Sequence, residues 1–378
     1  MLFDRFEVRI SLQKLLIGLV LVIVPLSVLG LYVTAQGDSR LQQTIGTHFK
    51  VIAQAKGDQV AQFLNERVLA CATLAAAQAV HDGIVASNKT YRGLGDAEIQ
   101  DKAGKIASVW NSPQGSEVAR AVLSSAASQF LRRRRDLDPR FLRITVSDEH
   151  AAAVAASDKP TVYLQSEEAY WQHIYEGARA SVYVGDVRYD DVSKSTYVGI
   201  AVPVIEEGSG SLIGAVYSLI DVSALFALFN DVQIGPGANA ILTKDDGSVI
   251  ASQNAILSMN LKSEEYAAVR GAMGSLQGRQ TGFIVASMRG GSRSIVGFAD
   301  AGLKQNYRNL GWIVVVSQEE REATAAIRGI GSFALLMVCL AGLMLTLTTV
   351  YFFLHRRQQF EDIEALHGVD APQVPLSK

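Results

Sequence analysis

The stretch FLRITVSDEHAAAVAAS, residues 141–157, decides the fold of the region around it. Its first part, FLRITVS, alternates apolar and polar side chains, which is the pattern of a half-buried β-strand because successive side chains point to opposite faces of a sheet. The polar triplet at 148–150 then predicts a turn, and residues 151–157 predict the returning strand. The stretch therefore predicts a β-hairpin.

Further strands are predicted after this hairpin. A short helical stretch at 167–177 separates it from three apolar, β-branched segments at 181–187, 195–205 and 211–222. Gly208-Ser209-Gly210 supplies the turn between the last two. A hairpin, a helix and a three-stranded meander predict a single antiparallel sheet of the PAS-like kind.

The same order of elements then repeats. The segment ILTKDDGSVIAS at 241–252 predicts a hairpin, residues 263–273 are helical in pattern, and three further strands end at Gln318. A degenerate repeat of this size predicts two stacked copies of one module. Gly235-Pro236-Gly237 marks the joint. The predicted fold class is α+β, with a membrane-distal module at 81–234 and a membrane-proximal module at 235–320.

A long amphipathic stalk helix is predicted ahead of the first module, over residues 34–80. Its apolar positions recur at steps of three and four: Leu41, Ile45, Phe49, Ile52, Val60, Leu64, Val68 and Cys71. Lys56 stands where the two halves of this stripe would join, and Gly57 beside it weakens the helix, so a kink there stays open. The stripe suits both packing against the chain's own modules and a homodimer interface.

Two uncharged segments flank this region, at residues 15–33 and 330–354. Each is long enough to cross the ~30 Å hydrocarbon layer of a bilayer. They predict two transmembrane helices that anchor the chain in lipid, in keeping with a mean hydropathy of +0.18. Buried core helices are the alternative for both segments, and a cleaved signal peptide is a second alternative for the first.

The charges that flank the two segments barely decide the membrane orientation. We therefore infer the orientation from the arrangement of the segments. Two spans place both termini on one side, so residues 1–14 and 355–378 are interpreted as cytoplasmic tails of a chain that crosses the inner (cytoplasmic) membrane twice. The large middle region is then periplasmic or extracellular. Residues 321–329 are predicted to form an exit helix that joins the second module to the second span.

Composition and motifs exclude several classes of function. Lys and Arg number 35 against 37 Asp and Glu, so no basic excess favours nucleic acid as a partner. Two cysteines, Cys71 and Cys339, provide neither a metal cluster nor a disulfide framework. The sequence lacks the nucleophile-elbow, zinc-protease and P-loop motifs, and its six histidines lack metal-ligand spacing. We therefore predict no enzyme and no cofactor.

Two groups of residues resemble a known family. The hairpin VSD…VAA at 146–156 and the segment YLQSEEAYWQ at 163–172 are similar to a DxxGxxVA hairpin followed by a Tyr-x-Gln-x-(Asp/Glu)-Glu-x-Trp-Trp helix start. VYVGDVRYD at 182–190 and IAVPV at 200–204 are similar to the strands that wall that module's pocket. In this order, over residues 35–328, they resemble the double Cache extracellular sensor domain of bacterial transmembrane receptors.

The resemblance implies a ligand pocket in the first module. Aromatic rings and carboxylates near the ends of its elements suit an amine or another small cation. The candidate ligand-binding residues are Tyr163, Glu168, Tyr170, Trp171, Tyr183, Asp186, Tyr189 and Asp221. In amino-acid-binding relatives, Tyr, Arg and Trp hold the ligand carboxylate ahead of an Asp that binds its amine. Asp221 falls at the place of that Asp, but the stretch from Tyr163 to Trp171 contains no Arg.

The implied function is that of a sensor, which would bind a small extracellular ligand and signal through the second span. The segment 355–378 is too short for a kinase, a cyclase or a HAMP module. The expected output is therefore a separate cytoplasmic signalling protein of a two-component or chemotaxis-type pathway, unless the chain is the sensory part of a longer protein. A membrane-anchored scaffold that binds another exported protein is the alternative function.

Overall fold

The structure is a computed structural model. It describes residues 12–175, 181–190, 195–230, 234–235, 237–252, 261–275, 281–325, 336–337 and 339–351. The chain divides into two compact units: Ile45–Glu320, and Met1–Thr44 together with Arg321–Lys378. The first unit contains both sheets and every cavity discussed below.

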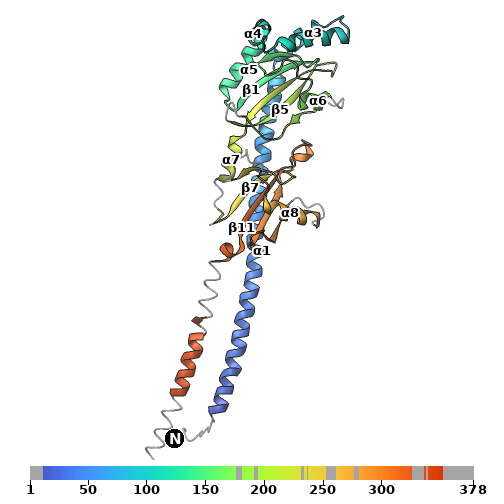
Figure 1. Ribbon diagram of the computed structural model, residues 1–378. Helices are drawn as coiled ribbons and strands as arrows, with labels where there is room; N and C mark the ends of the chain where they lie inside the picture. Colours follow the sequence, from blue (N-terminus) through green and yellow to red (C-terminus); the bar gives the residue numbers. More distant parts are fainter. Residues whose placement is uncertain are drawn as a thin grey trace, which may run out of the picture. The chain divides into compact units, whose positions relative to one another are not determined.

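Helix α1, Leu12–Ala75, is continuous and includes Pro25 (Figure 1). Its buried positions from residue 46 onward recur at steps of three and four: Gly46, Phe49, Ala53, Gly57, Val60, Leu64, Arg67, Cys71 and Leu74. The buried stripe passes through Gly57 and not through Lys56. Its two halves therefore join, and the helix is unbroken at this point. Gly57 faces the backbone of Ala301, because a Cβ at Gly57 would lie 3.5 Å from the Cα of Ala301, which is ordinary van der Waals contact. This stripe packs against the chain's own modules.

A layer of shorter helices follows α1. It consists of α2 (Gln78–Lys89), α3 (Asp96–Val109), the 3-10 turn η1 (Pro113–Gly115), α4 (Ser116–Ser124) and α5 (Ala126–Leu137). The Ser125 side chain caps α5 by accepting a hydrogen bond from the backbone N–H of Ser128. Helices α2 and α5 both contact strands β1 and β2, so this layer covers one face of the first sheet.

The first sheet is antiparallel, in the order β2-β1-β6-β5-β3 with β4 also paired to β5. Its strands are β1 (Phe141–Asp148), β2 (Ala153–Ala156), β3 (Tyr183–Val184), β4 (Arg188–Asp190), β5 (Ser195–Ile205) and β6 (Leu212–Asp221). The predicted hairpin is present as β1 and β2. The stretch at 181–187, expected to form one strand, contains only the short strand β3, and β4 follows it after a gap of three residues.

Strand alternation gives the first sheet two different faces. One face, with Ile144 and Val216, packs toward the helices, where a Cβ at Gly214 would meet the side chain of Ile84 in α2. The opposite face carries Thr145 and Tyr217, which the register places directly across from each other. Helix α6, Ala169–Tyr175, packs on this second face. The more polar face of the sheet is therefore covered by α6 and by the segment that precedes it.

The second sheet repeats the antiparallel arrangement in the order β8-β7-β11-β10-β9. Its strands are β7 (Asn239–Thr243), β8 (Val249–Ser252), β9 (Thr281–Ser287), β10 (Arg293–Asp300) and β11 (Ile313–Glu319). Helix α8 (Glu264–Ser275) packs on it, and the 3-10 turn η3 (Leu303–Gln305) follows β10. The expected repeat of one module is therefore confirmed. Helix α7, Ser223–Asn230, links the modules and was not predicted.

Among the described residues, no helix alone combines the length and apolar composition needed to cross a membrane. One bent pair, Ser39–Ala75 with Gln78–Lys89, meets those two criteria together, with a 57° angle between its helices. The predicted span at 330–354 lies partly outside the described residues, and a shorter apolar helix occupies Cys339–Tyr351 within it. The predicted tail at 355–378 and residues 1–11 lie wholly outside them.

Candidate functional site

A small cavity lies over the polar face of the first sheet. It has a volume of about 80 Å³. Strands β1 and β6 form its floor, and the segment before α6 forms its wall. Its lining residues are Arg143, Thr145, Pro160, Thr161, Val162, Gln165, Glu168, Tyr217 and Leu219.

The cavity carries one side chain of each charge. The guanidinium of Arg143 projects from β1, with its Nη1 3.4 Å from the hydroxyl oxygen of Thr161. Glu168 is exposed just before α6. Within the described part of the chain neither side chain forms an ion pair, so both keep hydrogen-bonding capacity for a ligand. A guanidinium binds carboxylates through paired N–H donors, and a carboxylate accepts from an ammonium group.

Tyr170 supports this lining from behind. Its ring stacks on Tyr217, with centroids 4.0 Å apart and planes 8° apart. Its hydroxyl donates to Oε1 of Gln165 at 3.0 Å, and the side-chain amide of Gln165 donates to the carbonyl oxygen of Val162 at 2.8 Å. Burial raises the pKa of both tyrosines, so both phenols stay protonated. Tyr170 thereby positions two residues of the cavity without lining it.

Trp110 anchors the wall of the cavity from the other side. Its indole N–H donates to the carbonyl oxygen of Pro160 at 2.8 Å. The side-chain amide of Asn111 donates to the carbonyl oxygen of Thr161 at 3.1 Å. The ammonium group of Lys159 returns a bond to the Trp110 carbonyl at 2.9 Å. Three hydrogen bonds thus hold the segment at 159–161 against the α3–η1 corner.

Four of the predicted ligand-binding residues lie near this cavity. Glu168 lines it, and Tyr170 is buried directly behind it. Trp171 is buried in the same hydrophobic cluster, against Ala201 and Ala215 of the sheet. Tyr163 packs on Trp110, with ring centroids 5.2 Å apart.

The other four predicted residues lie elsewhere in the first module. Asp221 accepts a hydrogen bond from the backbone N–H of Ser223 at 2.7 Å and so supports the start of α7. Asp186 pairs with Lys244 of the second module at 3.3 Å. Tyr183 packs near His173, and Tyr189 is exposed on β4. A ligand-binding role for these eight residues remains a prediction.

Sequence reasoning missed Arg143, Thr145 and Tyr217. A signal for the first two was present in FLRITVS, because the strand alternation places Arg143, Thr145 and Ser147 on one face. An arginine on the inner part of a strand between apolar neighbours indicates a polar space above the sheet. Tyr217 faces that same space because the register sets it opposite Thr145.

The hairpin that ends β1 is held by a buried carboxylate. Asp148 is fully buried and accepts hydrogen bonds from the Ser87 hydroxyl at 2.7 Å and from the backbone N–H groups of His150 and Ala152, each at 3.0 Å. Between them Ala151 adopts a left-handed conformation, with φ of 67°. Burial raises the pKa of Asp148 even though these donors oppose the shift.

The raised pKa of Asp148 predicts a pH effect on stability. The folded carboxyl keeps its proton to a higher pH than the unfolded one, so its contribution to the unfolding free energy is fully present below the unfolded pKa of about 4. That contribution declines as the pH rises through the folded pKa. Asp148→Asn should remove this decline, whereas Asp148→Ala should lose about 1–3 kcal/mol at neutral pH because buried donors are left unpaired. Melting temperatures between pH 4 and 7 test this, and parallel curves for wild type and Asp148→Asn contradict it.

The chain matches a known family over most of its length. The family model dCache_1, described as the Cache domain, matches residues 38–327. No curated protein matches the chain.

Several solved structures are similar to this chain at low sequence identity. The ligand-binding domain of the Campylobacter jejuni chemoreceptor Tlp3, in complex with 4-methylisoleucine, is 11% identical, with coverage of 75% of this chain and 94% of that one and a TM-score of 0.49. That of the Pseudomonas fluorescens chemoreceptor CtaA, in complex with L-isoleucine, is 12% identical, with coverage of 76% and 98% and a TM-score of 0.46. That of the Pseudomonas aeruginosa PAO1 amino acid chemoreceptor PctC, in complex with GABA, is 15% identical, with coverage of 72% and 99% and a TM-score of 0.45.

Proposed function

Because this chain belongs to the double Cache family, we propose that it is a membrane-anchored bacterial sensor that binds a small extracellular ligand in its membrane-distal module. The observation that supports this function most directly is the cavity over β1 and β6, with Arg143 and Glu168 in its lining. The proposal assigns no catalytic role to the chain.

The charges of the cavity favour a small zwitterion such as a free amino acid. Glu168 suits the amine that the sequence already indicated, and Arg143 supplies the carboxylate-binding group that the stretch from Tyr163 to Trp171 lacks. A pocket for a drug-sized ligand usually measures about 300–1,000 Å³. Since this cavity measures about 80 Å³, a ligand of more than a few non-hydrogen atoms requires the wall at 160–168 to move outward.

Signal transfer is proposed to run through the second module to the exit helix at 321–329 and the span at 330–354. A separate cytoplasmic signalling protein would receive it. Two subunits would associate through their stalk and transmembrane helices, and the exposed apolar side chains Val51 and Leu69 of α1 suit such a contact. These two residues lie five helical turns apart and so share one side of α1.

The cavity is tested with variants that neutralise one charge each. The full chain, purified in detergent, is screened by thermal unfolding against amino acids, aliphatic amines and small carboxylates, and the best ligand is titrated by calorimetry. A ligand at ~100 times its dissociation constant stabilises by ~2.7 kcal/mol. Arg143→Gln and Glu168→Gln should each weaken binding by about 10–100-fold, because each removes a charge-assisted hydrogen bond.

Matched controls remove a charge elsewhere in the same module. Arg133 and Glu117 are exposed on α5 and α4, so Arg133→Gln and Glu117→Gln should leave the affinity unchanged. If all four variants bind the ligand with the same affinity as wild type, the ligand binds outside this cavity. A folded chain that none of the screened compounds stabilises would instead favour the scaffold function.

A further inference from the structure

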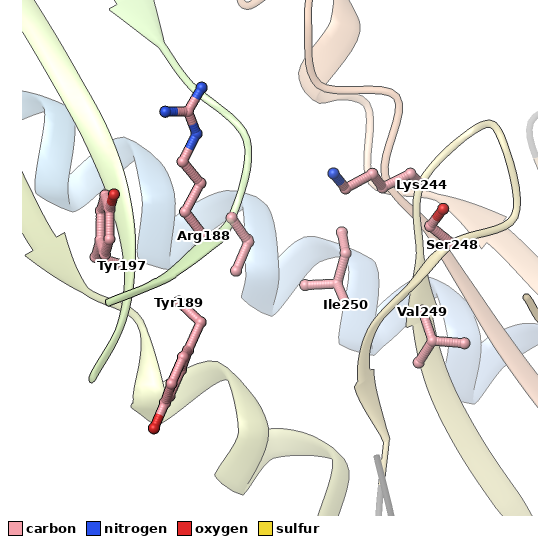
Figure 2. Close-up of a pocket in the computed structure, with 8 residues that line it drawn as sticks. Arg188, Tyr189, Tyr197, Lys244, Ser248, Val249 and Ile250 are labelled. Carbon is pink, nitrogen blue, oxygen red and sulfur yellow. The ribbon is translucent and has the colours of Figure 1, made fainter. Parts of the chain in front are cut away.

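A second cavity lies where the two modules meet. Its volume is about 340 Å³, which is within the usual range for small-molecule sites. The first module contributes residues of β4 and β5, and the second contributes the β7–β8 hairpin (Figure 2). We call it the junction cavity, and its lining residues are Val187, Arg188, Tyr189, Tyr197, Lys244, Ser248, Val249 and Ile250.

The two cations of the junction cavity come from different modules. The pairing of β4 with β5 sets Arg188 directly opposite Tyr197, so their side chains project from the same face of the sheet. Lys244 begins the turn between β7 and β8, and its backbone N–H bonds Ser248 O at 2.9 Å. In Figure 2 the ammonium group of Lys244 points toward the side on which Arg188 lies.

The positive charge of this cavity is only partly neutralised. Asp186, beside the cavity, pairs with Lys244 at 3.3 Å. Over the described ranges Arg188 forms no ion pair, and none of the lining residues is acidic. The Lys244 side chain is 29% exposed, so water screens its charge less than at an open surface. The cavity therefore has a net positive lining that an anion would neutralise.

The remaining lining residues define what such an anion would contact. Tyr197, which the strand pairing sets opposite Arg188, brings to the lining a hydroxyl that can donate a hydrogen bond. Ser248 donates its hydroxyl proton to Asp246 at 3.0 Å, so it can only accept from a ligand. Val249 and Ile250 form an apolar side. This combination suits an acidic group held between the cations and a short hydrocarbon part beyond it.

We propose that the junction cavity binds a small organic anion, through a carboxylate or phosphate group that bridges Arg188 and Lys244. Such a ligand contacts both modules at once, so its affinity depends on their relative arrangement. An anion that binds one arrangement more tightly than another shifts the population toward it. The junction cavity would thus adjust how the first module communicates with the second. It shares no lining residue with the cavity that holds Arg143 and Glu168, so each site can fail its test alone.

The full chain in detergent is titrated with succinate, citrate and inorganic phosphate, with ionic strength held constant by sodium chloride. At least one of these anions should raise the melting temperature in a saturable way that chloride does not reproduce. Arg188→Gln and Lys244→Gln should each weaken the effect about tenfold or more, and the double variant should abolish it. Comparison of succinate with phosphate identifies the acidic group that the site prefers.

Matched controls separate this site from general screening. Arg289 and Lys105 are exposed, at 89% and 75%, and lie away from the junction cavity, so Arg289→Gln and Lys105→Gln should keep the full anion response. Circular dichroism establishes that each variant is folded. The proposal is overturned if no anion stabilises the chain beyond chloride, or if the double variant responds like wild type. It is equally overturned if Arg143→Gln, instead of Arg188→Gln, removes the response, because the anion would then occupy the first cavity.

Discussion

Replacing Trp110 by alanine is expected to lower the free energy of unfolding by about 3–5 kcal/mol, the range for deleting a buried aromatic side chain. Trp110 is 1% exposed and packs with Ala119, Ala152, Ala153 and Tyr163. Its truncation leaves a cavity and removes the donor that holds the carbonyl of Pro160. Because native proteins are stable by only about 5–15 kcal/mol, this loss is large. Denaturant unfolding of the full chain measures it.

Trp110→Phe serves as the matched variant, because it keeps an aromatic ring but lacks the indole N–H. It should cost less than the alanine variant, and its main effect should be a looser segment at 159–161, because one of the three hydrogen bonds that hold this segment is lost. Since that segment forms the cavity wall, proteolysis should cut near Pro160 faster in Trp110→Phe than in wild type. An alanine variant as stable as wild type would refute the tight packing of this cluster.

The two sheets could be predicted because a period of two is a local property of the chain. Strand alternation in FLRITVS and the turn at Asp246-Gly247 depend only on neighbouring residues, and both recur in the structure. Helix α7 was missed because its eight residues, SALFALFN, are apolar on most sides and resemble a continuation of β6. Asp221 ends the strand there by bonding the backbone of Ser223, which is a side-chain contact that hydrophobic periodicity does not show.

The candidate site was harder to predict, because its residues come from strands that are far apart in the sequence. Thr145 and Tyr217 face each other only through the register of β1 with β6, and that register is a tertiary property. Aromatic residues near α6 were visible as a cluster, but the sequence does not tell which of them lines a space and which fills the core. Tyr170 shows the difference, since it lies behind Tyr217 and supports it.

Small residues at close contacts were also invisible to a search for large apolar positions. The buried stripe of α1 includes Gly46, Ala53 and Gly57, which no hydrophobic pattern singles out. They are buried because the second module approaches the helix backbone closely along this stretch. A Cβ at Gly46 would lie 2.2 Å from the ring of Phe283, and one at Gly297 would meet α1 itself.

Gly297→Ala is expected to destabilise the second module by about 2–3 kcal/mol, as overpacking of a well-packed core does. A Cβ at Gly297 would lie 2.5 Å from the carbonyl carbon of Phe49 and 2.6 Å from the backbone nitrogen of Lys50. These contacts are with helix backbone, which cannot rotate away as a flexible side chain can. Either β10 or α1 must therefore move, and hydrogen exchange should rise in both elements. Thermal and denaturant unfolding of the full chain measure the cost.

Gly271→Ala is the control, because it adds the same methyl group to the same module where nothing lies within 4 Å. Gly271 lies in α8, so the alanine should be neutral or should stabilise by up to ~1 kcal/mol through helix propensity. Equal stability of the two variants would mean that α1 does not pack closely on β10. If the contact is present, Gly297→Ala should also leave ligand affinity in the first module unchanged while it weakens output, because the second sheet lies between that module and the proposed exit helix along the chain.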